Sequence, residues 1–470
     1  MKAKNLGSCS MNYKQFLKTK IFSIPPVGKR VDPSLVNPQL FQFQRDIVLW
    51  ALQKGRAAIF AGTGLGKTLM QCEWARLVGG RVIIFAPLAV SRQTVTEAAK
   101  FGITVHYCAE AADACDGINI TNYERLEKFD IRDFNAVVLD ESSILKNMSG
   151  KLRTKLIDSC ARVPYRLACT ATPAPNDLME LCNHSEFLGI MTATEMLATF
   201  FTHDGGDTSK WRLKKHAVMK FWDWVASWAV MLTNPADIGY VEDGKRYILP
   251  PLRMHEHVVH SDDCSGFLFP MAAETLQERQ QARRDSIKER SEKCAEVVMN
   301  DKENSQWLIW CNLNDEAEAI RKLIPGAVEI RGSDSSERKE SAALGFASGE
   351  IKVLISKPLI FGMGLNFQRC HNMAFLGLSD SFEQYYQAVR RCWRFGQTQS
   401  VNVHIITDER EGAVVENIRR KEAQFQEMLA GMIASCQETN KANIKSAKRD
   451  LDDYKPKTTM TTPSWLTPAA

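Results

Sequence analysis

The sequence predicts an α/β protein with two parallel-sheet domains in tandem and a helical insertion in or after the first. Two observations predict the sheets: five short apolar runs alternate with helical patterns between residues 56 and 169, and five more do so between residues 307 and 406. A third observation, the helical pattern of residues 176–241, predicts the insertion. Strands that alternate with helices are typical of parallel sheets, because a parallel crossover needs a long connection.

Each apolar run is rich in residues that favour strands and is followed by polar, Gly or Pro residues. Buried parallel strands have this pattern, and such sheets bind ligands beyond the carboxyl ends of their strands. The runs of the first series are residues 57–60, 82–85, 118–120, 136–139 and 166–169, and those of the second are 307–310, 327–330, 352–355, 373–376 and 401–406.

Breakers and composition divide the chain. The sequence Leu-Pro-Pro-Leu at 249–252 indicates the crossing between the domains, and the polar residues 275–299 predict a helix that leads into the second. After Ala430 the apolar periodicity fades, and residues 458–470 have the Pro, Thr and Ser content of a disordered tail. We expect an N-terminal extension at 1–37, a first domain at 38–250 with a helical insertion at about 178–236, a linker helix and second domain at 251–435, and a disordered tail at 436–470.

The composition limits the possible partners and compartments. A balance of 60 Lys and Arg against 55 Asp and Glu leaves a net charge of +5, so a nucleic-acid site would have to be a local basic stripe. The 13 cysteines form no Cys-x-x-Cys pair, which is typical of a reduced interior, and no apolar run is long enough for an export signal or a membrane span. We expect a soluble, cytoplasmic protein. The residues His255, His257 and His260 alternate with others as in a strand, which favours a strand over a metal site.

Residues 61–68, Ala-Gly-Thr-Gly-Leu-Gly-Lys-Thr, follow a predicted strand and precede a predicted helix. Glycines permit a tight turn whose backbone N–H groups and helix N-terminus face phosphates, Lys67 would meet the β- and γ-phosphate oxygens, and Thr68 would ligate Mg²⁺. A turn without a ligand is the alternative, and Ala61 stands where such loops usually have Gly. The candidate nucleotide-binding residues here are Gly62, Thr63, Gly64, Leu65, Gly66, Lys67 and Thr68.

The predicted strand 136–139 ends in Asp140 and Glu141. After a phosphate loop, this pair is suited to hold Mg²⁺ through Asp140 and to orient the attacking water through Glu141. Alone it would be a solvated loop start. The segment 169–173, Cys-Thr-Ala-Thr-Pro, places hydroxyls at another strand end, where they could bond the Asp140 loop; a plain Pro-terminated turn is the alternative.

Further candidates lie outside the phosphate loop. Phe43 and Gln44 precede an amphipathic helix, where a ring could stack on adenine and an amide could read its edge. In the second domain the segment 361–366 includes Gly364, whose lack of a side chain allows a nucleotide or a phosphodiester to approach. The residues Arg391 and Arg394 lie three apart on a predicted helix, hence on one face, and would stabilise a transferring phosphoryl group. A basic surface helix is the alternative.

In this order the segments resemble the motifs of superfamily-two helicases, and within them the Swi/Snf-type duplex DNA translocases. The residues 118–124, 362–366 and 387–397 are similar to that branch's Tyr-containing motif, its Gly-x-Gly-Leu-Asn segment and its Gln-Ala-x-x-Arg-x-x-Arg-x-Gly-Gln signature. The resemblance implies two RecA-like lobes, ATP and Mg²⁺ between them, a catalytic role for Gln387, and DNA contacts by Tyr123 and Asn366. It also implies a DNA-dependent ATPase that acts as a monomer, with duplex DNA favoured over single strands and RNA, and possible replication, recombination or modification partners.

The chain departs from the family at two places. Ser142-Ser143 replaces the usual x-His pair after the two carboxylates, so the coupling role of that His passes to Ser143 or is lost. Cys392-Trp393 replaces the usual residue-His pair before Arg394. The compact architecture resembles helicase-like proteins of bacteriophages and prophages.

A basic and aromatic stretch at 210–216 completes the candidates. In the predicted helical insertion, Lys214 and Lys215 would contact DNA phosphates near Trp211, with an amphipathic helix edge as the alternative. A strand-separating helicase and an ATP-gated clamp or loader that holds nucleic acid without travelling remain alternatives to a translocase.

Overall fold

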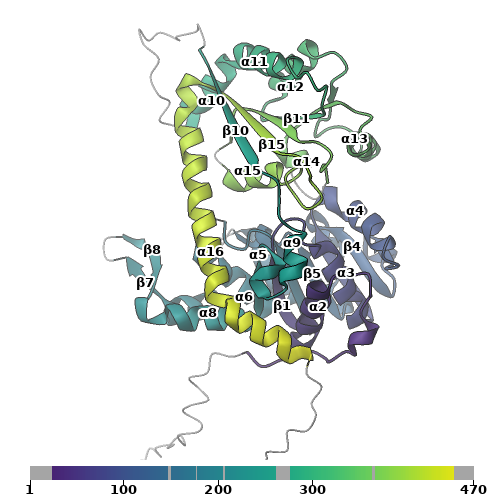
Figure 1. Ribbon diagram of the computed structural model, residues 1–470. Helices are drawn as coiled ribbons and strands as arrows, with labels where there is room; N and C mark the ends of the chain where they lie inside the picture. Colours follow the sequence, from purple (N-terminus) through teal and green to yellow (C-terminus); the bar gives the residue numbers. More distant parts are fainter. Residues whose placement is uncertain are drawn as a thin grey trace, which may run out of the picture.

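The computed structural model describes residues 24–146, 150–175, 177–204, 207–260, 276–361, 366–379 and 381–448. Two α/β lobes lie one above the other, and one long C-terminal helix runs beside both (Figure 1). The fold is therefore two tandem α/β domains, each built on a parallel sheet, as predicted. In this part of the chain no helix is long and apolar enough to cross a membrane.

Lobe 1 is a seven-stranded parallel sheet in the order β3-β4-β2-β5-β6-β1-β9. Its central strands are buried at nearly every position because helices cover both faces, which explains the continuous apolar runs of the sequence. The strands are β1 (Arg56–Ala61), β2 (Arg81–Ala86), β3 (Val105–Tyr107), β4 (Gly117–Asn122), β5 (Ala136–Asp140), β6 (Tyr165–Thr170) and β9 (Ala229–Leu232); the first helices are α2 (Gln42–Lys54), α3 (Lys67–Val78), α4 (Leu88–Ala99) and α5 (Lys151–Cys160).

The insertion predicted at about 178–236 is only partly helical. Two strands inside it form an antiparallel hairpin, and β9 joins the lobe 1 sheet beside β1. The four residues of β9 are apolar and buried, so the edge of the sheet gives them a partner that the local pattern alone does not reveal. The elements here are α6 (Leu181–Leu188), α7 (Ala193–Phe200), β7 (Phe201–Asp204), β8 (Asp207–Leu213) and α8 (Val218–Ala226), and α9 (Val241–Lys245) follows the insertion.

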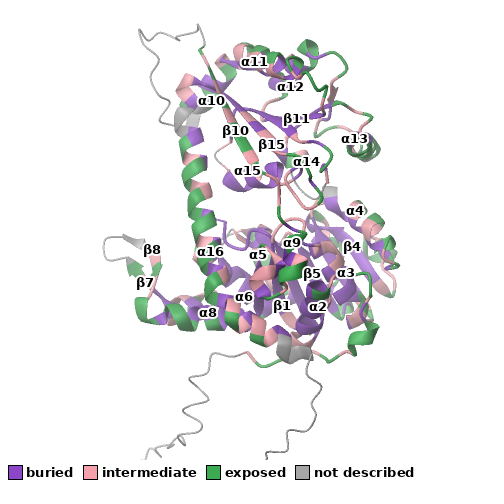
Figure 2. Cartoon of the chain, in the orientation of Figure 1, coloured by how far each residue is buried: buried purple, intermediate pink, exposed green. Residues whose placement is uncertain are grey.

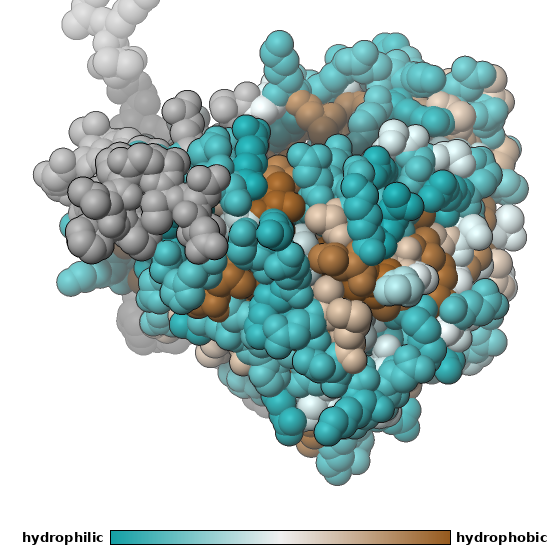
Figure 3. Space-filling model, turned by 90° about the horizontal axis from the view of Figure 1, so that it is seen from above, coloured by the Kyte–Doolittle hydropathy of each residue, from teal (hydrophilic) through white to brown (hydrophobic). Residues whose placement is uncertain are grey.

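Lobe 2 is a six-stranded parallel sheet in the order β10-β15-β14-β11-β13-β12. The histidine-rich run is strand β10, as predicted. Figure 3 shows a mainly hydrophilic face at this end of the molecule, interrupted by hydrophobic patches. The elements are β10 (Leu252–Val259), α10 (Leu276–Asp285), α11 (Ile287–Met299), β11 (Trp307–Cys311), α12 (Asn314–Leu323), β12 (Val328–Glu329), α13 (Ser336–Ser348), β13 (Val353–Ser356), α14 (Pro358–Phe361), β14 (Asn372–Leu376), α15 (Phe382–Val389) and β15 (Val401–Asp408).

Short 3-10 helices connect these elements, several of them at the carboxyl ends of strands. They are η1 (Pro33–Leu35), η2 (Ala111–Asp113), η3 (Tyr123–Lys128), η4 (Ile131–Asp133), η5 (Ser142–Lys146), η6 (Leu178–Glu180), η7 (Lys215–Ala217), η8 (Pro235–Ile238) and η9 (Glu409–Glu411).

Helix α16 (Gly412–Lys448) joins the cores of both lobes. Its 37 residues span about 56 Å. Phe425 packs in the lobe 2 core, whereas Met432 and Cys436 pack in one lobe 1 core cluster and Ile444 in another. Figure 2 shows the buried positions recurring along the helix.

The predicted disordered tail is therefore wrong for residues 436–448, which belong to α16. Contacts with lobe 1 stabilise this half: Asn443 Nδ2 donates to the Ala226 carbonyl at 3.0 Å, and Thr439 Oγ1 donates to Asp223 Oδ1 at 3.3 Å. Residues 449–470 lie outside the described part of the chain.

Candidate active site

The phosphate loop lies at the carboxyl end of β1 and leads into α3. Gly64 and Gly66 have φ of +90° and +80°, a region that favours glycine, so the turn depends on them. The first turn of α3 has N–H groups without intrahelical partners, and these carry the positive end of the helix dipole. The loop is anchored on its other side because Gly62 N donates to the Leu232 carbonyl of β9 at 2.8 Å. This geometry suits an anion.

Two side chains of the loop fit a phosphate group. Lys67 is 8% exposed, and its Nζ donates to the Ala61 carbonyl at 2.9 Å, so the ammonium lies inside the loop. Burial lowers the pKa of Lys67, while the charges of Glu141 and Asp140 oppose that shift. Among the described residues, the buried Thr63 Oγ1 has no hydrogen-bond partner, so it is a donor that a phosphate oxygen would satisfy.

The carboxylates Asp140 and Glu141 end β5, facing this loop. Burial and the neighbouring charge of Glu141 raise the pKa of Asp140 to about 7, against the opposing charge of Lys67. Glu141 has φ of +51°, a region that costs a non-glycine residue roughly 1 kcal/mol or more. Thr170 Oγ1 lies 3.5 Å from Glu141 Oε2, which agrees with the predicted contact between the hydroxyls at the end of β6 and the loop after β5.

The arginines of lobe 2 reach the same site. Burial lowers the pKa of Arg391 to about 9, Arg394 lowers it further, and Glu141 opposes the shift. Burial also lowers the pKa of Arg394, and Glu97 and Glu141 oppose it. Since Glu141 influences both guanidinium groups, and Arg394 influences Lys67, the two halves of the site lie within electrostatic reach of each other.

The two arginines do not lie on a helix, contrary to prediction. Helix α15 ends at Val389, and Arg391 folds back so that its Nη2 donates to Gln387 Oε1 and its Nε to the Gln387 carbonyl, both at 3.2 Å. These bonds satisfy the end of the helix and direct the arginine inward. Gln387 therefore holds Arg391, and the catalytic contact predicted for it stays a prediction.

The lobes touch at the phosphate loop itself. A Cβ atom on Gly64 would lie 3.0 Å from both the Cβ and N atoms of Phe395 in lobe 2. The Phe395 ring stacks on Tyr247 with 4.5 Å between centroids, and Arg246 lies 5.4 Å from the ring centre of Phe41. This aromatic group was missed in the sequence, because nothing local connects Tyr247 with the loops that it meets.

The predicted adenine residues have structural roles. Phe43 is fully buried in the lobe 1 core, so its ring cannot stack on a base in this arrangement. Gln44 Nε2 donates to the Leu65 carbonyl at 2.9 Å, and Gln44 Oε1 accepts from Phe41 N at 2.9 Å. Gln44 thus supports the phosphate loop from below.

The predicted DNA contacts are dispersed. Tyr123 is 1% exposed and its Oη donates to the Asp140 carbonyl at 2.6 Å, so burial prevents the predicted contact with nucleic acid. Asn366 is half-buried beside Gln368, whereas Gly364 lies outside the described residues.

In the stretch at 210–216, the residues up to Leu213 belong to strand β8, and Lys215 and His216 begin the short 3-10 helix η7. Lys214 Nζ donates to the Ala198 carbonyl at 2.7 Å near the end of α7, so this cation has a structural partner, while Lys215 is exposed.

The site fits a magnesium ion held jointly with phosphates. Within the described residues no group of three or more His, Cys, Asp or Glu side chains is placed to hold a metal alone. Mg²⁺ is usually held by one or two protein oxygens plus phosphate oxygens, and Thr68 and Asp140 offer that number here. A nucleotide bound in the phosphate loop beside them would supply the phosphate oxygens.

Comparisons with known proteins identify part of lobe 2. Curated proteins give no match to the chain. Among solved structures, the SWI2/SNF2 ATPase core of Sulfolobus solfataricus in complex with dsDNA is similar at 16% identity and a TM-score of 0.41, covering 88% of this chain and 98% of that one. Residues 289–396 match the helicase conserved C-terminal domain, so the matched segment of this chain includes both arginines of the candidate site.

Proposed function

We propose that this protein is a DNA-dependent ATPase that couples hydrolysis to movement along duplex DNA. The observation that carries the proposal is the division of one site between two lobes: the phosphate loop and Glu141 come from lobe 1, and Arg391 and Arg394 from lobe 2. The helicase conserved C-terminal domain match in lobe 2 supports a helicase-like ATPase.

Each residue has a definite task in this proposal. Lys67 and the backbone of the loop bind the β- and γ-phosphates, and Glu141 orients a water molecule in line with the γ-phosphorus. The water oxygen bonds to phosphorus as the bond to the bridging oxygen breaks, so ADP and phosphate leave. Arg391 and Arg394 neutralise the charge that gathers on the transferring group. A bound Mg²⁺, held by Thr68 and Asp140, would supply further charge neutralisation.

Hydrolysis would change the attraction between the lobes, because the γ-phosphate is the group that both lobes bind. Loss of this shared ligand permits the lobes to separate, and rebinding of ATP draws them together. Alternate grips of the two lobes on the DNA backbone would then move the protein along a duplex. Such contacts are mainly to phosphates, so binding should depend strongly on salt and weakly on sequence.

The test compares ATP hydrolysis with duplex DNA, single-stranded DNA, RNA and no nucleic acid. We expect the largest stimulation with duplex DNA, and a rate that rises with duplex length. A rate that does not depend on length would favour the ATP-gated clamp, and strand separation would favour a helicase. The Lys67→Ala variant is the control, since its rate should fall to background; retained hydrolysis there would refute the site.

A further inference from the structure

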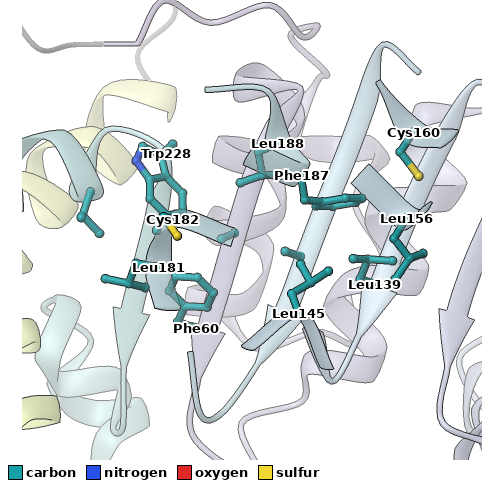
Figure 4. Close-up of a cluster of buried hydrophobic side chains, with 14 of the residues drawn as sticks. Phe60, Leu139, Leu145, Leu156, Cys160, Leu181, Cys182, Phe187, Leu188 and Trp228 are labelled. Atoms are coloured by element: carbon teal, nitrogen blue, oxygen red, sulfur yellow. The ribbon is translucent and has the colours of Figure 1, made fainter. Parts of the chain in front are cut away.

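The segment after Glu141 is the short helix η5 (Ser142–Lys146), which lobe 1 holds in place. Ser142 Oγ lies 3.0 Å from Nε2 of the fully buried His184. Leu145 is fully buried, and Figure 4 shows it among the buried side chains of lobe 1, near Leu139. Because η5 begins at the residue after Glu141, a contact made by its last residue can act on the backbone at Glu141.

The last residue of η5 stays attached to lobe 1 through its carbonyl, which accepts from Asn183 Nδ2 at 3.4 Å, while its side chain pairs with lobe 2. The Lys146 ammonium donates to the carboxylate of Glu383 on α15. The Lys146 side chain is 38% exposed, but that of Glu383 is 10% exposed, and Lys146 is the one cation paired with it in the part of the chain that the structure describes. A largely buried carboxylate needs its cation, so this pair depends on the lobes being together.

The helix that carries Glu383 also positions an arginine of the site. Gln387 follows Glu383 by four residues, one helical turn, and accepts the hydrogen bond from Arg391. The ion pair therefore connects the segment behind Glu141 to the helix behind Arg391.

We propose that Lys146 and Glu383 are positioning residues that align Glu141 with the lobe 2 arginines when the lobes close. This inference rests on the proposed function. Glu141 has φ of +51°, which few residues other than glycine adopt, so its backbone would relax if η5 were released. The water-orienting carboxylate would then move relative to Arg391. The pair touches no substrate itself, so it should affect turnover more than nucleotide binding.

The experiment measures kcat with saturating duplex DNA and the Kd of a fluorescent ATP analogue. We expect Lys146→Ala to lower kcat about tenfold, equivalent to about 1.4 kcal/mol, and to leave the Kd within about twofold. Lys146→Glu should lose at least as much, and the double variant Lys146→Glu/Glu383→Lys should recover to within about threefold of the parent. Lys146→Arg keeps the positive charge, so this variant tests the proposal even if the charge-swap variant Lys146→Glu/Glu383→Lys does not fold.

A matched control is Lys155→Ala, which removes another Lys–Glu pair, with Glu127, that lies within lobe 1. We expect it to leave kcat unchanged. An unchanged kcat in Lys146→Ala, or a double variant no better than the singles, would overturn the positioning role. If the parent protein itself does not hydrolyse ATP in a Lys67-dependent way, the proposed function fails as well, so the two failures are distinguishable.

Discussion

Replacing Ile444 by Ala tests the unexpected half of α16. Ile444 is 1% exposed and belongs to the buried lobe 1 cluster that includes Ile47 of α2. The substitution removes three carbon atoms, worth about 0.8 kcal/mol each by transfer, and the remaining cavity adds to that loss. We expect the free energy of unfolding to fall by about 3 kcal/mol, which corresponds to a melting temperature lower by roughly 6 to 12 °C.

The assay is urea unfolding combined with hydrogen exchange of α2, because the two lobes can unfold in separate steps. Protection of the α2 amides should fall in the variant. Glu438→Ala is the matched control: it lies on the same half of α16, is exposed, and pairs only with Lys441 in the described structure, so its effect should stay within about 0.5 kcal/mol. If Ile444→Ala behaved like this control, the C-terminal half of α16 would not be packed on lobe 1.

Three further outcomes are expected. Arg394→Ala should bind ATP nearly as the parent does but lose turnover by about 10³-fold or more, since the guanidinium acts on the transition state; parental turnover in rapid-mixing assays would refute the split site. Burial lowers the pKa of His184 from 6.5 to about 4. Between these pH values the imidazole is protonated in the unfolded chain and neutral in the folded protein, so the free energy of unfolding should fall by about 3 kcal/mol from pH 6.5 to 4. Urea titrations of His184→Gln should have a flatter profile across that range, and an equal slope would contradict this assignment. Lys215→Ala should reduce the log–log salt slope of DNA binding by about one if it contacts a phosphate, whereas Lys214→Ala should instead lower stability; an unchanged slope in Lys215→Ala would place the DNA contacts elsewhere.

The strands and the phosphate loop could be predicted because their signals are local. A strand such as β5 is a short apolar run that ends in charged residues, and a parallel sheet buries both faces of such a run. The glycines of the loop adopt the φ values for which glycine is needed. In both cases the residues that form the sequence pattern are the same residues that determine the local structure.

Helix α16 was not predicted, and its residues 436–448 were assigned to a disordered tail although a weak signal was present. Met432, Cys436, Asn440 and Ile444 recur every four residues and are all buried. One of the four, Asn440, is polar, and the rest of the helix is rich in polar residues, so the apolar periodicity is weak. Its stability comes from contacts with residues about 200 to 400 positions earlier, which a local pattern does not contain.

Chemistry was predicted more reliably than position. The charge of Glu141 acts on both Arg391 and Arg394, but Tyr123 lies inside the protein and Phe43 lies in the core. A motif specifies which residue types a reaction needs, whereas the environment of each side chain depends on what the rest of the chain packs against it.

The path of α16 also has a consequence for how the protein is made. A ribosome adds about 5 to 20 residues each second, so roughly 10 to 40 seconds separate the emergence of α8 from that of Ile444. During this interval lobe 2 is synthesised while the surface of α2 and α8 that α16 will cover faces water. Lobe 1 is thus the first lobe to be synthesised and the last to be completed. The packing of α16 that completes it also connects the two lobes of the nascent chain.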